Sequence, residues 1–267
     1  MAPMNALFSA WVNLRNSLDW WLRNSLTWSP SAREQAEEKG EADARETHFI
    51  ANYFLFSARQ RMTNSRWQRN LAVLERLESA SRSPALDKLL RQTGPLRILD
   101  IGSKNFDYVD ALAGFFSRCL SHRDVQITGL EIDAHRRYTD LRTRRAWAEH
   151  YVSFVPSARY FAADLLNHTE TYHAITWFFP FLTEFPLLKW GLPLSLFQPA
   201  TLLAHAWSLL LPGGVLILVN QTDAELETQC KLLAELGAPF DPRQGRVTVA
   251  YKTSAFISSN ERLTRNG

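Results

Sequence analysis

The sequence is poor in cysteine, since only Cys119 and Cys230 occur among 267 residues and neither belongs to a Cys-x-x-Cys pair. Two isolated cysteines cannot build a disulfide framework or the usual structural zinc site, so we expect no metal and a reducing compartment. The sequence also lacks an uninterrupted run of about 18 to 20 apolar residues, the length that a membrane-spanning helix needs. Its N-terminus has no basic start, apolar core and cleavage site of a secretory signal. We therefore expect a cytoplasmic protein.

A strong excess of charge of one sign is also missing. The formal net charge is +3, with 46% hydrophobic and 21% charged residues, which is ordinary for a soluble globular protein. Such a small net charge does not by itself indicate a nucleic-acid partner, and we expect none. The length is sufficient for one sizeable α/β domain with an accessory segment.

An amphipathic pattern occupies residues 5–28, within an N-terminal segment 1–30. Its large apolar residues recur at three- and four-residue spacing and therefore share one helix face: Leu7, Trp11, Leu14, Leu18 and Trp21. Tryptophan beside arginine suits the headgroup boundary of a membrane, which allows a peripheral membrane contact. The alternative is that the stripe packs on the protein's own helices or on a second subunit. Residues 31–46 are almost wholly polar and predict a linker or a solvated helix.

Residues 47–93 have helical patterns and predict a helical cap, with a break at Ser83–Pro84. From residue 94 to 257 strands and helices alternate, before a tail at 258–267. The expected strands are Leu96–Ile101, Val125–Ile132, Ala158–Ala162, Ala174–Phe178, Gly214–Asn220 and Arg246–Lys252. The expected helices between them are Tyr108–Cys119, His135–His150, Ala200–Leu211 and Asp223–Leu236. This alternation predicts an α/β fold, a Rossmann-like and mostly parallel sheet with helices on both faces.

The first predicted strand leads into the most informative turn. The segment Leu96–Phe106 reads LRILDIGSKNF, so Asp100 ends an apolar strand and Gly102 opens a polar turn. In open α/β sheets ligands bind at the carboxyl ends of the strands, near the first strand's turn. A glycine there lets the backbone approach a ligand closely.

Two further acids follow at the ends of later strands. Gly129-Leu-Glu-Ile-Asp133 places Glu131, with Asp133 beside it, where a carboxylate can accept both ribose hydroxyl groups. Asp164 follows the third strand, within reach of an adenine amino group. Residues 211–214, Leu-Pro-Gly-Gly, then predict a tight turn before the fifth strand.

This order of residues resembles the class I S-adenosylmethionine-dependent methyltransferases, over about Leu96 to Lys252. The resemblance implies S-adenosyl-L-methionine as cofactor. It places Asp100 and Gly102 at the methionine end, Glu131 on the ribose and Asp164 at the adenine, and we add the turn residues Ser103 and Lys104 to the candidate cofactor-binding set.

The chain departs from the family pattern in the turn itself. Lys104 and Phe106 stand where the family has its second and third glycines. A non-glycine residue at positive φ costs about 1 to 2 kcal/mol, so we expect a turn of different shape. Lys104 either pairs with the cofactor's carboxylate or is solvated. The absence of a glycine-rich turn also argues against a dinucleotide, whose pyrophosphate needs one.

The methyl acceptor is less clear from the sequence. Residues 175–197 form a long aromatic, proline-broken segment that either lines a pocket for an apolar molecule or packs beneath the N-terminal helices. The base candidates His173, Glu184 and His205 each have an ordinary packing role as the alternative, so no catalytic residue is assigned. The basic run 135–145 is interpreted as a solvated helix, with an RNA-binding face as the alternative.

We therefore predict a methyltransferase acting on a small-molecule or lipid-like substrate. The alternatives are a methyltransferase-like binding or scaffold protein without turnover, and an RNA methyltransferase.

Overall fold

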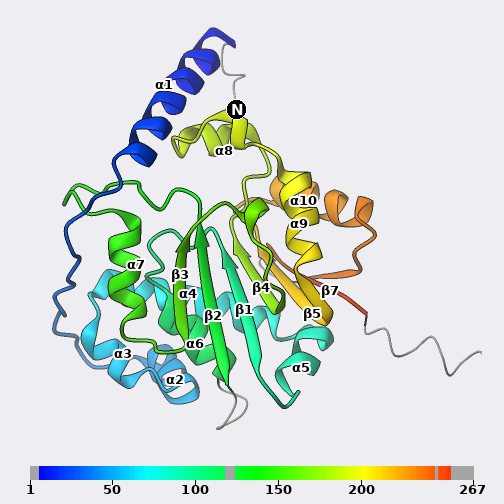
Figure 1. The fold of residues 1–267 in the computed structure, drawn as a ribbon. Helices are drawn as coiled ribbons and strands as arrows, with labels where there is room; N and C mark the ends of the chain where they lie inside the picture. The colour runs from blue at the N-terminus through cyan, green and yellow to red at the C-terminus, as the bar shows by residue number, and fades with distance from the viewer. Residues whose placement is uncertain (1–5, 118–123, 244–245, 254–267) are drawn as a thin grey trace, which may run out of the picture.

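The computed structural model describes residues 6–117, 124–243 and 246–253 of the chain (Figure 1). Some predictions therefore lie outside the described residues. They concern position 5 at the start of the predicted N-terminal helix, Cys119, the end of the predicted domain at 254–257, and the tail 258–267.

A seven-stranded sheet organises the molecule, in the order β3-β2-β1-β4-β5-β7-β6. Its strands are β1 (Leu96–Ile101), β2 (Val125–Glu131), β3 (Ala158–Ala162), β4 (Tyr172–Phe178), β5 (Leu210–Val219), β6 (Phe240–Arg243) and β7 (Val247–Tyr251). The first five pair in parallel, whereas β7 runs antiparallel to both β5 and β6. The Rossmann-like, mostly parallel sheet predicted from the sequence is confirmed.

The order of the strands reverses next to β1. From β1 the chain proceeds outward to β2 and β3, and it then returns to place β4 on the other side of β1. Such a reversal leaves a crevice at the carboxyl ends of the two central strands, where open α/β sheets bind their ligands.

One prediction about β5 was incomplete and one strand was missed. β5 begins at Leu210 rather than Gly214, and a register shift against β4 accommodates the Pro-Gly-Gly residues inside the strand. The predicted helix Ala200–Leu211 therefore ends earlier, as α9 (Pro199–Ser208). β6 contains a proline and pairs only with the edge of β7, so its sequence carried no clear strand pattern.

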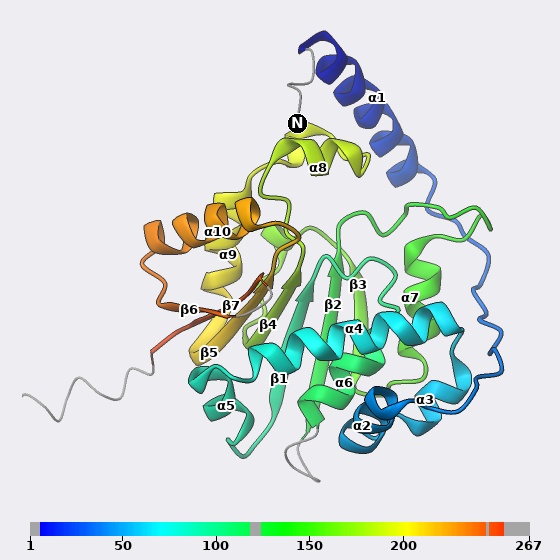
Figure 2. The same ribbon diagram turned by 180° about the vertical axis from the view of Figure 1, so that it is seen from behind.

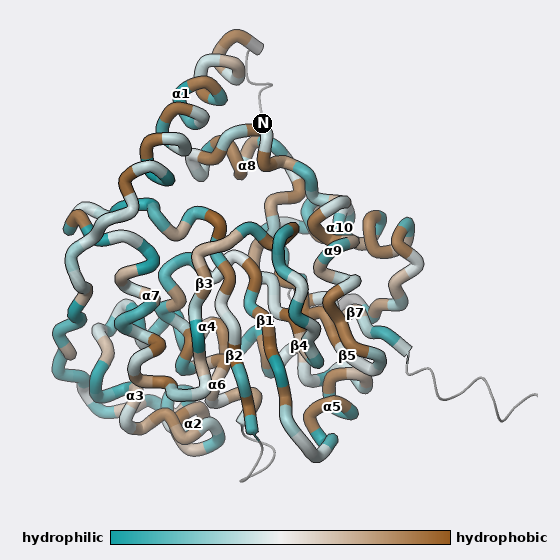
Figure 3. Tube along the Cα trace, viewed as in Figure 1, coloured by the Kyte–Doolittle hydropathy of each residue, from teal (hydrophilic) through white to brown (hydrophobic). Residues whose placement is uncertain are grey.

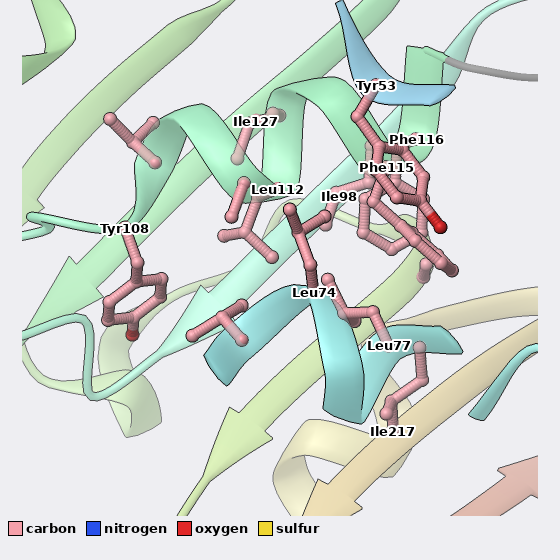
Figure 4. Packing of buried hydrophobic residues seen from close by; sticks show 14 of the residues in the cluster. Tyr53, Leu74, Leu77, Ile98, Tyr108, Leu112, Phe115, Phe116, Ile127 and Ile217 are labelled. Atoms are coloured by element: carbon pink, nitrogen blue, oxygen red, sulfur yellow. The ribbon is translucent and has the colours of Figure 1, made fainter. Parts of the chain in front are cut away.

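The larger hydrophobic core lies on one face of the sheet, beneath α4 (Asn64–Ala80), α5 (Pro84–Leu90), α6 (Val109–Ser117) and α7 (Arg144–Val152). Figure 2 shows α4 and α6 crossing this face, with α2 (Ala44–Tyr53) and α3 (Phe56–Arg61) beside them. Leu74 and Leu77 of α4 pack with Leu112 of α6 and Ile98 of β1 (Figure 4). Residues 47–93 are thus part of the main core and do more than cap it.

The opposite face carries α9 and α10 (Asp223–Glu235). Leu203 and Ala206 of α9 and Leu233 of α10 belong to a second cluster with the sheet residues that point to this side. Thr222 and Glu225 form a capping box that begins α10, as the sequence order Thr-x-x-Glu favours. The helices on both faces agree with the predicted architecture.

The predicted helix His135–His150 is wrong in its first half. The helix α7 begins only at Arg144, because the side chain of Thr143 caps it by accepting from the backbone N–H of Ala146. The preceding residues form a turn in which Arg137 and Thr143 make an isolated bridge. Polar side chains that bond to local backbone compete with helix formation, which the helical spacing of apolar residues does not reveal.

The sequence indicated a linker or a solvated helix for the polar segment 31–46, but part of this segment contacts the rest of the protein. Glu34 forms an ion pair with Arg66, whose side chain is fully buried in α4, and also accepts from Thr63. Glu37 accepts from the backbone N–H of Asn64 at the same helix end. The segment therefore ties the N-terminal helix to the N-terminus of α4.

Candidate functional site

Two non-glycine residues in the turn after β1 have positive φ angles, which are energetically costly for such residues. Lys104 has φ 54° and Phe106 has φ 55°, both in the left-handed region that glycine usually occupies. The backbone N–H of Lys104 donates to the Glu131 carboxylate at 2.7 Å, and its carbonyl accepts from the Tyr160 hydroxyl at 2.7 Å. Contacts from β2 and β3 thus hold the turn with both non-glycine residues in the left-handed region.

Phe106 has a packing partner that offsets its strained backbone. Its side chain is fully buried, and a Cβ on Gly129 of β2 would lie 2.7 Å from its ring. The ring therefore occupies the space that a side chain at position 129 would fill. Burying a phenylalanine side chain contributes about 1.5 to 3 kcal/mol, which is enough to offset the cost of one left-handed residue.

Glu131 stands at the end of β2 and receives two backbone hydrogen bonds. One oxygen accepts from Lys104 and the other from Asp133 at 2.8 Å, while Arg144 lies 3.5 Å from it. Each carboxylate oxygen has two lone pairs, so both retain capacity for a further donor. The acid is therefore fixed in place while remaining able to bind hydroxyl groups.

Asp100 and Ser103 lie behind the site rather than in it. Asp100 is fully buried and accepts from the hydroxyl groups of Thr176 and Tyr108, each at 2.7 Å. Burial raises its pKa to about 6, although these two hydrogen bonds act in the opposite direction. The Ser103 hydroxyl joins the Asp100 carbonyl to the backbone N–H of Leu130. Both residues brace the turn through contacts between strands.

The other four predicted site residues line one cavity. Gly102, Lys104, Glu131 and Asp164 come from the ends of β1, β2 and β3 and share about 1290 Å³ of space not filled by protein atoms, part of it open to solvent. Asp164 caps a short helical turn, Leu165–Asn167, and accepts from Leu166 at 3.0 Å. Residues that are tens of positions apart in the sequence thus lie together at the carboxyl ends of the strands, where this strand order leaves a crevice.

An apolar part of the wall comes from the end of β4 and from the aromatic segment that follows it. Trp177, Phe178 and Phe181 line the cavity, followed by Trp190 and Leu192 beyond α8 (Glu184–Lys189). The structure thus answers the question that the sequence left open, because this segment both lines a pocket and contacts the N-terminal helix. Asn16 of that helix donates to the carbonyl groups of Leu188 and Leu192.

Trp190 is the residue that sequence reasoning missed. Its ring lies 4.6 Å from the Lys104 amine and 5.3 Å from the Arg144 guanidinium carbon. The pKa of Lys104 is lowered, first by desolvation and then by the nearby Arg144. A tryptophan beside cations is a cation–π arrangement that positions the amine. The only signal in the sequence was its place in the aromatic segment.

The base candidates from the sequence do not reach the cavity. His173 lies at the opposite end of β4 and accepts from the backbone N–H of Arg97. His205 on α9 is bonded to the carbonyl of His168, and Glu184 is exposed on α8. None of the three is among the residues that line the cavity.

The arginines of the basic run 135–145 are engaged within the chain. Arg136 and Arg144 pair with Asp133, Arg142 with Asp140 and Arg145 with Glu149. Because they are paired within the chain, these arginines are less available to bind RNA phosphates than unpaired arginines on a solvated helix would be.

No group of three or more histidine, cysteine, aspartate or glutamate side chains within the described ranges could hold a metal ion. Among the same residues, no helix is both long and apolar enough to cross a membrane.

No protein-family model matches the chain, and neither does any of the curated proteins. Solved structures of methyltransferases are similar at low identity. Magnesium protoporphyrin IX methyltransferase from Synechocystis PCC 6803, with bound S-adenosylmethionine, is 13% identical over 95% of this chain and 100% of its own, with a TM-score of 0.43.

Two further solved structures give similar values. An amino pentose methyltransferase from Micromonospora echinaspora is 16% identical over 81% of this chain and 100% of its own, with a TM-score of 0.43. A methyltransferase dependent on the same cofactor from Aquifex aeolicus is 12% identical over 67% and 96%, also with a TM-score of 0.43.

Proposed function

We propose that the chain is an S-adenosylmethionine-dependent methyltransferase acting on a small-molecule or lipid-like acceptor. The observation that carries the proposal is the convergence of Gly102, Lys104, Glu131 and Asp164 on one cavity at the strand ends. These are four of the six residues that the family resemblance, together with the turn, assigns to the cofactor; the other two, Asp100 and Ser103, lie behind the cavity.

The residues fit the cofactor in chemistry and in space. A Cβ built on Gly102 would meet nothing within 4 Å, so the backbone there is open to a close approach. Glu131 retains acceptor capacity for ribose hydroxyl groups, and Asp164 can accept from an adenine amine. Lys104 is held by Trp190 at the same edge, where an ammonium can pair with the methionine carboxylate.

When bound, the cofactor supplies an electrophilic methyl group on a sulfonium. The chain's own contribution is to hold the acceptor in line with that group and to exclude water, which is a large part of catalysis in displacement reactions. The apolar wall of Trp177, Phe178 and Phe181 serves both purposes.

Polar side chains also line the cavity, namely those of Gln198, Gln221 and Gln229. Gln229 lines the cavity and is 1% exposed, and its Nε2 has no hydrogen-bond partner among the described residues. Asn220 donates to the Gln229 Oε1 at 3.0 Å and so fixes the amide.

Titration calorimetry with S-adenosylmethionine and S-adenosylhomocysteine tests the proposal directly. We expect both to bind, and we expect Glu131→Ala to weaken binding by about 1 to 3 kcal/mol, because ribose hydroxyl groups lose a charged acceptor. Glu184→Ala, at an exposed position on α8, is the matched control. If the folded parent chain binds neither compound, the proposal is wrong.

A second titration tests the role of Lys104. Lys104→Met should weaken S-adenosylmethionine far more than 5′-methylthioadenosine, which lacks the carboxylate. An equal loss for both ligands would contradict the contact. Binding of the cofactor without transfer to any acceptor in a methyl-release assay would favour the scaffold alternative.

A further inference from the structure

The N-terminal helix α1 (Ala6–Ser25) turns its apolar side away from the protein. Leu7 is 79% exposed, Trp11 58% and Trp21 65%. The exposed stripe, as we call it, comprises nine large apolar side chains, each at least 47% exposed, that run from the helix into the following segment: Leu7, Phe8, Trp11, Leu14, Leu18, Trp21, Leu22, Leu26 and Trp28. The expectation that this stripe packs on the protein's own helices is therefore wrong.

The inward side of α1 is mostly polar, with Val12 as its buried apolar residue, and its asparagines are satisfied by hydrogen bonds. Asn16 is fully buried and donates to the carbonyl groups of Leu188 and Leu192 at 2.9 and 3.0 Å. Asn13 accepts from the backbone N–H of Leu194 at 2.7 Å. The helix is thus anchored by its polar face, and its apolar face is not needed for packing within the chain.

Arg23 extends the anchoring toward the cofactor site. It donates to the carbonyl of Gly191 at 2.9 Å and lies 3.4 Å from Asp133. Asp133 in turn donates its backbone N–H to Glu131. The position of α1 is therefore connected, through short contacts, to the candidate ribose acid.

We propose that α1 binds the surface of an anionic lipid bilayer through the exposed stripe, and that this contact holds residues 188–194, here named the roof segment, over the cavity. The roof segment carries Trp190 and Leu192, which line the cavity. Membrane binding by α1 does not depend on the proposed function. Its consequence, that an apolar acceptor enters the cavity from the bilayer, does rest on the proposed function.

The arrangement of charge and aromatic rings favours a bilayer as the occupant. The Arg15 guanidinium lies 5.5 Å from the Trp11 ring centroid, and exposed Arg137 donates to the carbonyl groups of Leu26 and Trp28. Both cations are exposed beside the stripe, and the one acid of α1, Asp19, is also exposed and acts on Arg23. Tryptophan rings with arginines at their border match the boundary between acyl chains and anionic headgroups.

The place of α1 in the molecule agrees with this occupant. Figure 1 shows α1 standing out at one end of the molecule, beyond α8, and Figure 3 shows apolar and polar residues alternating around it. The described residues contain no helix that could span a membrane, so an interfacial helix lying on the bilayer is the geometry proposed.

Vesicle sedimentation with the full chain tests the binding. We expect the chain to pellet with vesicles of phosphatidylcholine and phosphatidylglycerol, and Trp11→Ser with Trp21→Ser to reduce the bound fraction at least tenfold. The matched control is Phe54→Ser with Phe56→Ser, because these aromatics are 79% and 64% exposed but lie at the end of α2 and the start of α3. The control should pellet as the parent does.

Two results would overturn the lipid surface as occupant. In the first, the parent chain stays in the supernatant with both neutral and anionic vesicles. In the second, analytical ultracentrifugation shows a dimer that the tryptophan substitutions abolish, while vesicle binding is absent. That outcome would assign the stripe to a second copy of the chain.

Hydrogen exchange measures the coupling to the roof segment. We expect vesicles to slow amide exchange in residues 188–194 at least fivefold in the parent, and Asn16→Ala to bind vesicles yet lose this slowing. Equal exchange with and without vesicles would refute the coupling. Because cofactor titration needs no vesicles, its failure and the failure of vesicle binding are separate results.

Discussion

The helices α1 and α4 have similar lengths and both are amphipathic, yet they bury opposite faces. α4 places Leu71, Leu74 and Leu77 against the sheet, each with no exposed surface. α1 places Asn16 inward and leaves Leu14 and Leu18 about 60% exposed. The comparison teaches that a periodic apolar stripe predicts a helix but not the direction in which the stripe points.

The arginines of the two helices are expected to give the largest difference. Arg66→Met should destabilise the chain by about 3 to 5 kcal/mol, because Asp110 and Glu34 would remain as buried charges that have lost a partner. Arg23→Met should cost less than about 1 kcal/mol, since Asp133 keeps Arg136 and Arg144. Urea unfolding followed by circular dichroism measures both; equal shifts would break the comparison.

A matched pair of leucines gives the next largest difference. Leu74→Ala removes a fully buried side chain and should lower the free energy of unfolding by about 2 to 5 kcal/mol. Leu18→Ala, at 57% exposure, should change it by less than about 0.5 kcal/mol. The same urea midpoints decide the outcome. A loss at Leu18 comparable to that at Leu74 would mean that the stripe packs on protein in solution.

The buried asparagines Asn70 and Asn16 are expected to give the smallest difference in the free energy of unfolding, but they distinguish the two helices by a second measurement, hydrogen exchange. Asn70→Ala should cost about 1 to 3 kcal/mol, because it leaves the carbonyl of Asp107 and the N–H of Ala111 without their partner. Asn16→Ala should leave the urea midpoint nearly unchanged and instead speed hydrogen exchange in the roof segment. If both variants lower the midpoint equally, α1 unfolds together with the core.

The sequence was sufficient for the parallel strands of the sheet, but not for β6 or for the start of β5. β1 and β3 were predicted with the observed bounds, since apolar runs end there at acids or turns. The half of the predicted helix at 135–143 failed because Thr143 and its neighbours bond to local backbone. Such side-chain choices depend on neighbours that spacing does not specify.

The sequence predicted residues that belong to the candidate site, but it did not predict how their side chains are arranged. The motifs brought Gly102, Lys104, Glu131 and Asp164 together because parallel strands end at one edge. That Asp100 faces Thr176 instead of the cavity depends on a strand distant in the sequence. The contribution of Trp190 depends on where α1 and the roof segment settle, which is a property of tertiary packing alone.

The packing of Phe106 on Gly129 has a consequence for how such turns are recognised. Phe106 belongs to the turn after β1 and Gly129 to β2, and the ring of Phe106 occupies the volume that Gly129 leaves free. Phe106 therefore requires that position 129 carry no side chain, and the lack of a side chain there provides the space for the ring. A pattern that asks for a small residue at one position of this pair would recognise turns that a pattern of three glycines within one loop passes over.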